Sequence, residues 1–166
     1  MSDALQLAID ALTIEDVSIR SMTADMADGY DPKFDPDAEV LNVQLKHVVS
    51  SFEVVDVGSE DQSIELLRVF IDLGVRWVRT AAPDAGEDPD EPSEIANEVA
   101  AIEAVMIADY SMESSPGEDA LEQFAHQNAS FHVWPYWREF VSNQCLRMNL
   151  PKLVLPTRQF YRPPGD

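Results

Sequence analysis

Hydrophobic and polar residues alternate most regularly over residues 67–77, in the middle of the chain. The apolar face of this run carries Leu67, Val69, Ile71, Leu73, Val75 and Trp77. The opposite face carries Arg68, Phe70, Asp72 and Arg76. An earlier run, residues 40–57, alternates in the same way, and residues 58–61 have the composition of a tight turn. The pattern predicts an antiparallel β-hairpin with one buried face.

The region before this hairpin predicts a short helix and one more strand. Residues 2–12 place Leu5, Ile9 and Leu12 on one helical face. The period then changes to alternation over residues 17–24, which is typical of a strand, and an acidic, turn-rich connection follows at residues 25–39. Within the first hairpin strand the alternation slips at residues 47–49, which predicts a bulge or a bend.

The second half of the chain is mainly helical in pattern. Residues 81–94 are rich in Pro, Asp and Glu and predict a solvated loop. Residues 95–112 fit a helix and one face of a strand equally well, and periodicity leaves both open. Residues 118–127 begin a helix, and residues 128–148 predict a longer one that ends before Pro151. The tail, residues 157–166, should be irregular.

The composition indicates which classes of partner the chain can bind. The chain has 166 residues, which fits a single domain, and its 11 basic and 31 acidic residues give a net charge of -20. A field of that sign repels nucleic acid and anionic lipid and favours basic partners. The single cysteine, Cys145, excludes an internal disulfide. With no signal-peptide pattern and no apolar run long enough for a membrane helix, we expect a soluble, cytoplasmic protein.

Signatures of catalysis and of cofactor binding are absent from the sequence. It has no phosphate loop and no dinucleotide-binding glycine motif. His126 and His132 are six positions apart, which does not place them on one helical face as a metal pair. Cys145 lies on an apolar helical stripe, where a packed thiol is expected rather than a nucleophile. We therefore expect no enzyme, no cofactor and no metal.

The predicted long helix carries a distinctive motif. Its residues are Trp134, Pro135, Tyr136, Arg138 and Glu139. A second motif follows at Pro151, Leu153 and Leu155. The joint spacing resembles the SecB family of protein-export chaperones, a group that includes the SecB-like chaperones of toxin–antitoxin modules. The close match is confined to residues 131–156, although the order of the preceding elements is also similar. The chain departs from the export type after Leu155, because Pro163 and Pro164 leave no room for a C-terminal lid helix.

The resemblance implies an α+β fold in which an antiparallel four-stranded sheet packs on a long C-terminal helix. Residues 95–112 would then be the fourth strand. It also implies a homotetramer, a dimer of dimers with the long helices between two sheets. The interface residues would be Trp134, Trp137, Val141, Cys145 and Met148. One sheet and one helix leave an apolar face partly uncovered, which is a physical reason for association.

The implied function is an ATP-independent holding chaperone that binds unfolded polypeptides, preprotein or antitoxin, and passes them to a partner such as a translocation ATPase. The candidate client-binding residues are Phe70, Trp77, Trp134, Leu153 and Leu155, with structural packing as the alternative role of each. A second hypothesis from the charge alone is an acidic interaction protein that mimics nucleic acid and binds one basic partner.

Overall fold

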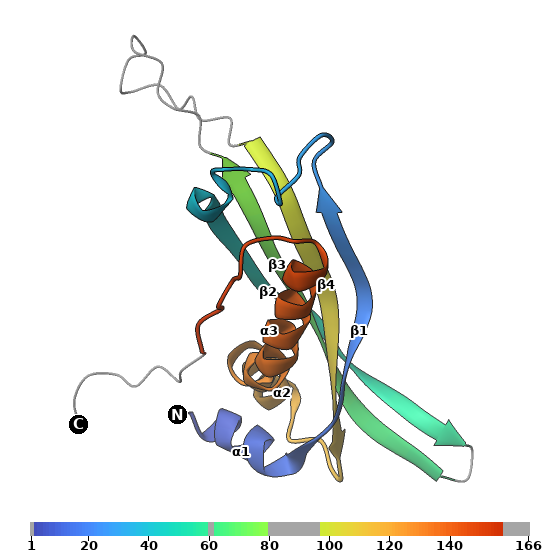
Figure 1. Cartoon of the computed structure of the whole chain (residues 1–166). Coiled ribbons are helices and arrows are strands. Elements are labelled where there is room, and N and C mark those ends of the chain that lie inside the picture. Colours follow the sequence, from blue (N-terminus) through green and yellow to red (C-terminus); the bar gives the residue numbers. More distant parts are fainter. Residues whose placement is uncertain (1, 60–61, 80–96, 158–166) are drawn as a thin grey trace, which may run out of the picture.

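The computed structural model describes residues 2–59, 62–79 and 97–157 (Figure 1). Three α-helices and four strands occur in this part of the chain. In chain order they are α1 Asp3–Ala11, β1 Leu12–Met26, the short 3-10 helix η1 Ala38–Val40, β2 Asn42–Ser59, β3 Gln62–Arg79, β4 Asn97–Met112, α2 Glu118–Gln127 and α3 Ala129–Arg147. The predicted loop at residues 81–94 and the end of the predicted tail, residues 158–166, lie outside the described residues.

The four strands form one antiparallel sheet in the order β1-β4-β3-β2. The predicted hairpin is confirmed as β2 and β3, and the predicted bulge lies between Val49 and Ser51. Residues 95–112, which periodicity left open, contain β4 at the centre of the sheet. The sheet therefore has two edges, β1 and β2.

β1 is longer than residues 17–24, the range that alternation predicted. Its pairing with β4 shifts at two places, between Ile14 and Asp16 and between Ile19 and Ser21. Each bulge adds one residue and reverses the alternation, so only the middle of β1 keeps a period of two. The first bulge explains why the sequence pattern missed the beginning of the strand, whereas the second lies inside the predicted range.

One face of the sheet is covered by the helices (Figure 1). The alternating apolar residues of β3, from Leu67 to Trp77, are buried beneath them, as are Ile102, Met106 and Tyr110 of β4. The outer face carries polar pairs instead. Arg68 donates two hydrogen bonds to Asp109, from Nε to Oδ1 and from Nη2 to Oδ2, both at 2.8 Å. The predicted α+β fold, a four-stranded antiparallel sheet on a long C-terminal helix, is confirmed.

The helical layer is held together at its ends. The Ser2 side chain accepts a hydrogen bond from the Leu5 amide and so caps α1 at its start. The Ser2 hydroxyl also bonds to Gln123, which joins α1 to α2. α2 and α3 follow one another with a single break at Asn128. After α3 the chain reverses at Asn149, whose φ is 55°, and residues 150–157 run back beside the helix (Figure 1).

Candidate functional site

The residues expected to contact a client do not share one surface. Trp77, Trp134 and Leu155 are buried in the core of the chain, with at most 8% of their surface exposed. Leu153 is half-buried beside them. Phe70 lies on the opposite face of the sheet, where the Arg20 guanidinium sits 6.0 Å from the centre of its ring. In the single chain, these five residues therefore line no common groove.

The residues expected at an oligomer interface lie on the side of α3 that faces the chain's own sheet. Trp137, Val141 and Cys145 are fully buried there, and Trp134 nearly so. Met148 is half-buried. Burial also raises the pKa of the Cys145 thiol, which keeps it protonated and unreactive. The solvent side of α3 exposes two other large side chains, Tyr136 and Leu146, and Leu146 is 80% exposed.

Apolar side chains remain uncovered along β1. We call Ile14, Ile19, Met22 and Met26 the β1 strip, and each is at least 40% exposed. They pair with Tyr110, Met106, Ala104 and Ala100 of β4, which are all buried beneath the helices. Directly paired residues point to the same face of a sheet, so the β1 strip belongs to the helix-covered face.

A matching row lies along the other edge of the same face. We call Val43, Leu45, Val49 and Phe52 the β2 strip. Val43 and Leu45 are exposed, and Val49 and Phe52 are half-buried. The geometry explains both strips. A helix with its side chains is about 10–12 Å wide, whereas four strands at about 4.8 Å spacing are much wider. α3 contacts β4 most and leaves most of the strip residues at the two edges exposed.

The two sequence motifs meet in space beside the β2 strip. The Trp134 indole Nε1–H donates a hydrogen bond of 2.7 Å to the Pro156 carbonyl oxygen, which anchors the segment after α3. His47 of β2 approaches the same indole edge-on, with 6.2 Å between ring centres, and its Nε2 lies 2.8 Å from the Ser130 hydroxyl. The motifs thus fix the position of residues 150–157 over one side of the sheet.

A buried polar pair lies under the junction of α2 and α3. The Tyr110 hydroxyl is 3.0 Å from His132 Nδ1, and Phe124 packs edge-on against the Tyr110 ring at 4.9 Å. Burial raises the pKa of Tyr110 beyond its ordinary range and lowers the pKa of His132. Both groups are therefore neutral near pH 7. They satisfy each other inside the core, which is a structural role.

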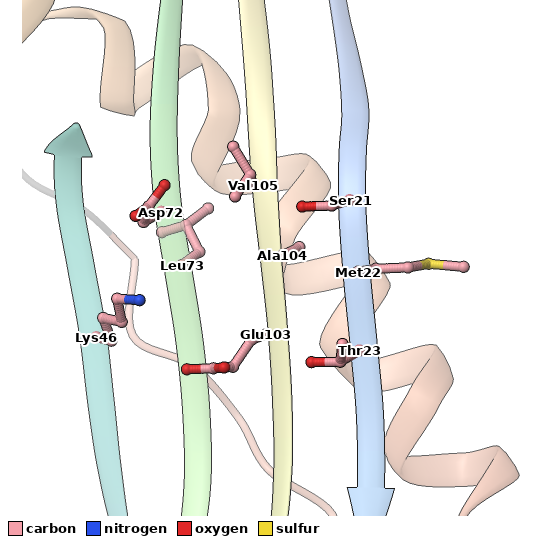
Figure 2. A pocket seen from close by; sticks show the side chains of 9 residues that line it. All are labelled: Ser21, Met22, Thr23, Lys46, Asp72, Leu73, Glu103, Ala104 and Val105. Atoms are coloured by element: carbon pink, nitrogen blue, oxygen red, sulfur yellow. The ribbon is translucent and has the colours of Figure 1, made fainter. Parts of the chain in front are cut away.

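The outer face has a shallow hollow, of about 180 Å³, over the centre of the sheet (Figure 2). At its border lies Gly74, which has no side chain and lines a smaller neighbouring recess of about 80 Å³. A Cβ at that position would come within 3.3 Å of Glu103 Oε1 and of Lys46 Cβ. Lys46, Asp72 and Glu103 point into the hollow from three strands (Figure 2). The hollow is open and has charged side chains on its border, which distinguishes it from the apolar strips on the other face.

Residues 2–59, 62–79 and 97–157 contain no group of three or more His, Cys, Asp or Glu side chains that could hold a metal ion. None of the helices in the same ranges is long and apolar enough to span a membrane.

No protein-family model matches the sequence, and no curated protein matches it. A solved structure does match over nearly the whole length. It is the SecB-like chaperone of Mycobacterium tuberculosis in complex with a ChAD peptide from the HigA1 antitoxin. The TM-score is 0.63 at 21% sequence identity, and the match covers 98% of this chain and 99% of that chain. The chain has a SecB-like fold.

The SecB-like fold confirms the resemblance drawn from the two motifs. The sequence pattern did not predict the two strips, although some of their residues lie in predicted strands. Leu45 belongs to a predicted strand, and Met22 lies within one. The strips could have been predicted from the number of apolar residues on the four strands, because one helix cannot cover all of them. Only the strand order places the surplus at the two edges.

Proposed function

We propose that this protein is an ATP-independent holding chaperone, not an enzyme, that acts in the cytoplasm as a homotetramer. It binds unfolded or nascent polypeptides, an antitoxin or a preprotein, and hands them to a partner protein. The observation that carries the proposal is the pair of apolar strips on one face of a SecB-like fold. A similar structure holds an antitoxin peptide, which supports an antitoxin as client more directly than a preprotein and its translocation ATPase.

The strips have the chemistry that binding to many sequences requires. Two of the exposed residues in the β1 strip, Met22 and Met26, have flexible side chains that adapt to differently shaped partners. Both strips lie on edge strands, so an extended client can add backbone hydrogen bonds to side-chain contacts. Backbone pairing is independent of sequence and therefore suits a chaperone.

The five predicted client residues take defined places in this proposal. Leu153, half-buried against the core, contacts the client directly. Trp77, Trp134 and Leu155 form the wall and floor under that contact, and Phe70 contacts a client only across the outer face. We further propose that the whole chain, residues 1–166, acts as one domain.

The test is an aggregation assay with strip variants. A reduced, unfolded protein is diluted from denaturant without nucleotide, with either the wild-type chain or a variant. We expect the wild type to suppress aggregation near one oligomer per client. Val43→Ser combined with Leu45→Ser should require several-fold more chaperone, and Ile19→Ser combined with Met22→Ser likewise, because each pair loses about 2–4 kcal/mol of apolar contact.

Val48→Ser is the matched control, because Val48 is an exposed valine of β2 that points to the outer face. It should suppress aggregation as well as the wild type. If all the variants suppress equally, the strips do not bind clients. If even the wild type fails with every unfolded client, the holdase proposal is wrong and a dedicated acidic interaction protein becomes the better explanation.

A further inference from the structure

The β2–β3 hairpin extends beyond the rest of the sheet (Figure 1). Pairing between β2 and β3 continues to Ser59 and Gln62, whereas pairing between β3 and β4 begins only at Leu66 with Ser111. Residues 56–59 and 62–65 of this hairpin, which we call the arm, are therefore a two-stranded ribbon. Val57 and Ile64 are exposed on it. Such ribbons are marginally stable alone in water, so an apolar ribbon of this kind gains from a partner.

β3 has a free edge within the arm. Among the described residues, positions 62–65 pair with β2 on one side and with no strand on the other. β4 ends at Met112, opposite the place where β3 leaves the sheet. Unpaired backbone amides and carbonyls on a strand edge are a template for another strand. At about 3.3 Å per residue, this edge accommodates roughly four residues of an extended chain.

The free edge opens into a notch between the arm and the body of the molecule. The notch has a volume of about 640 Å³. It is lined by Ala11, Thr13, Ser63, Ile64, Glu65, Ser111, Met112 and Glu113. Ile64 is 54% exposed here and supplies an apolar contact, with the thioether of Met112 on the body side. The notch thus combines a strand edge with an apolar contact.

The charge of the notch is negative. Glu65 and Glu113 belong to its lining, and Glu15 lies next to it with its carboxylate accepting a hydrogen bond from the Ser111 hydroxyl. The lining contains no Lys, Arg or His among the described residues. The nearest arginine along β3, Arg68, is held by both carboxylate oxygens of Asp109. An acidic occupant would therefore meet uncompensated repulsion here.

We propose that the notch is a docking site for an extended polypeptide segment in which Lys or Arg residues flank an apolar side chain. The segment pairs as a strand with residues 62–65, buries its apolar side chain against Ile64, and places its cations beside Glu65 and Glu113. A second copy of this chain is a poor occupant, because each copy carries a net charge of -20. The site is separate from the strips and goes beyond the holdase proposal.

The probe is a fluorescein-labelled peptide that alternates lysine and valine, bound to the full chain and followed by fluorescence polarisation. We expect binding that weakens as salt is raised. A peptide that alternates glutamate and valine should not bind. A lysine–valine peptide with N-methyl groups on alternate amides should bind at least about tenfold more weakly, because it cannot pair with a strand edge. The experiment needs no unfolded client, so its failure leaves the holdase proposal standing.

The site is located with two variants and two controls. Ile64→Lys should weaken binding about tenfold or more, and Glu65→Gln should reduce affinity and salt dependence together. Val48→Lys and Glu139→Gln are controls at exposed positions outside the notch, and they should bind the probe as the wild type does. Circular dichroism shows whether each variant folds. If Ile64→Lys does not fold, the binding measured with Glu65→Gln tests the proposal. Equal binding by the glutamate–valine peptide, by the N-methylated peptide or by folded notch variants overturns the proposal.

Discussion

The contact between Tyr110 and His132 is the clearest case of a residue whose role depends on burial. Tyr110 is fully buried, and its hydroxyl is satisfied by His132 Nδ1. A buried hydroxyl without a partner lowers the free energy of unfolding, so the contact with His132 stabilises the fold. His126, on the exposed side of α2, makes an edge-on ring contact with Phe52. Two histidines six positions apart thus have different roles.

Protonation of His132 should destabilise the fold. Burial lowers the pKa of His132 in the folded chain below its ordinary value of 6.5. As the pH falls through that value, the unfolded chain binds a proton that the folded chain excludes, and the free energy of unfolding decreases. Above that pH, His132 is neutral in both the folded and the unfolded chain, so this loss of stability disappears. We expect the urea midpoint of the wild type to decrease as the pH is lowered from about 7.5 to about 5.5.

His132→Gln removes the titrating group and should flatten the urea midpoint over this window, while costing about 1–3 kcal/mol at pH about 7.5 through the lost Tyr110 contact. His126→Gln is the control and should keep the pH dependence of the wild type. A His132→Gln variant that loses stability with acid as steeply as the wild type would falsify the assignment.

At the scale of elements, the far end of the segment after α3 is held by a side-chain hydrogen bond from the helix. Trp134→Phe keeps an aromatic ring but removes the Nε1–H that donates to the Pro156 carbonyl oxygen. We expect a loss of about 1 kcal/mol in the free energy of unfolding. Amide hydrogen exchange should become faster over residues 150–157 and remain unchanged in β3 and β4. Tyr136→Phe, an exposed change on the same helix, should alter neither, and unchanged exchange in Trp134→Phe would show that the Trp134 hydrogen bond is not what holds the segment.

The elements differ in how far the sequence could predict them. The alternation in β3 could be recognised because residues 67–77 have a continuously buried apolar side, and the pairing with β4 shifts only after Trp77. The alternation in β4 could not, because small and apolar residues such as Ala101 and Val105 also occupy its outer face, as expected for a central strand. Among the site residues, Trp134 and Leu155 were recognisable by motif. Their burial could not be predicted, because it depends on where the returning segment crosses the sheet.

At the scale of the whole molecule, the incompletely covered apolar face of the sheet favours association of copies, whereas the negative charge opposes it. The strips and the solvent side of α3 favour association through apolar contact. The net charge of -20 opposes any association of like chains. An oligomer is therefore expected to form through surfaces low in carboxylates, and to be favoured by salt, which screens the repulsion while leaving apolar contact intact.

The exposed side of α3 is the surface that best meets this condition. A helix that lies between two sheets shows one side to each, and the side turned away from its own sheet carries Tyr136 and Leu146. We expect Leu146→Glu to lower the molar mass measured by light scattering, because every copy in a symmetric assembly adds a buried charge to the interface. Val48→Glu, an equally new charge at an exposed position of the outer face, should leave the mass unchanged. Should Leu146→Glu keep the wild-type mass while Val48→Glu lowers it, the copies associate through the outer faces of their sheets, and the long helices do not lie between them.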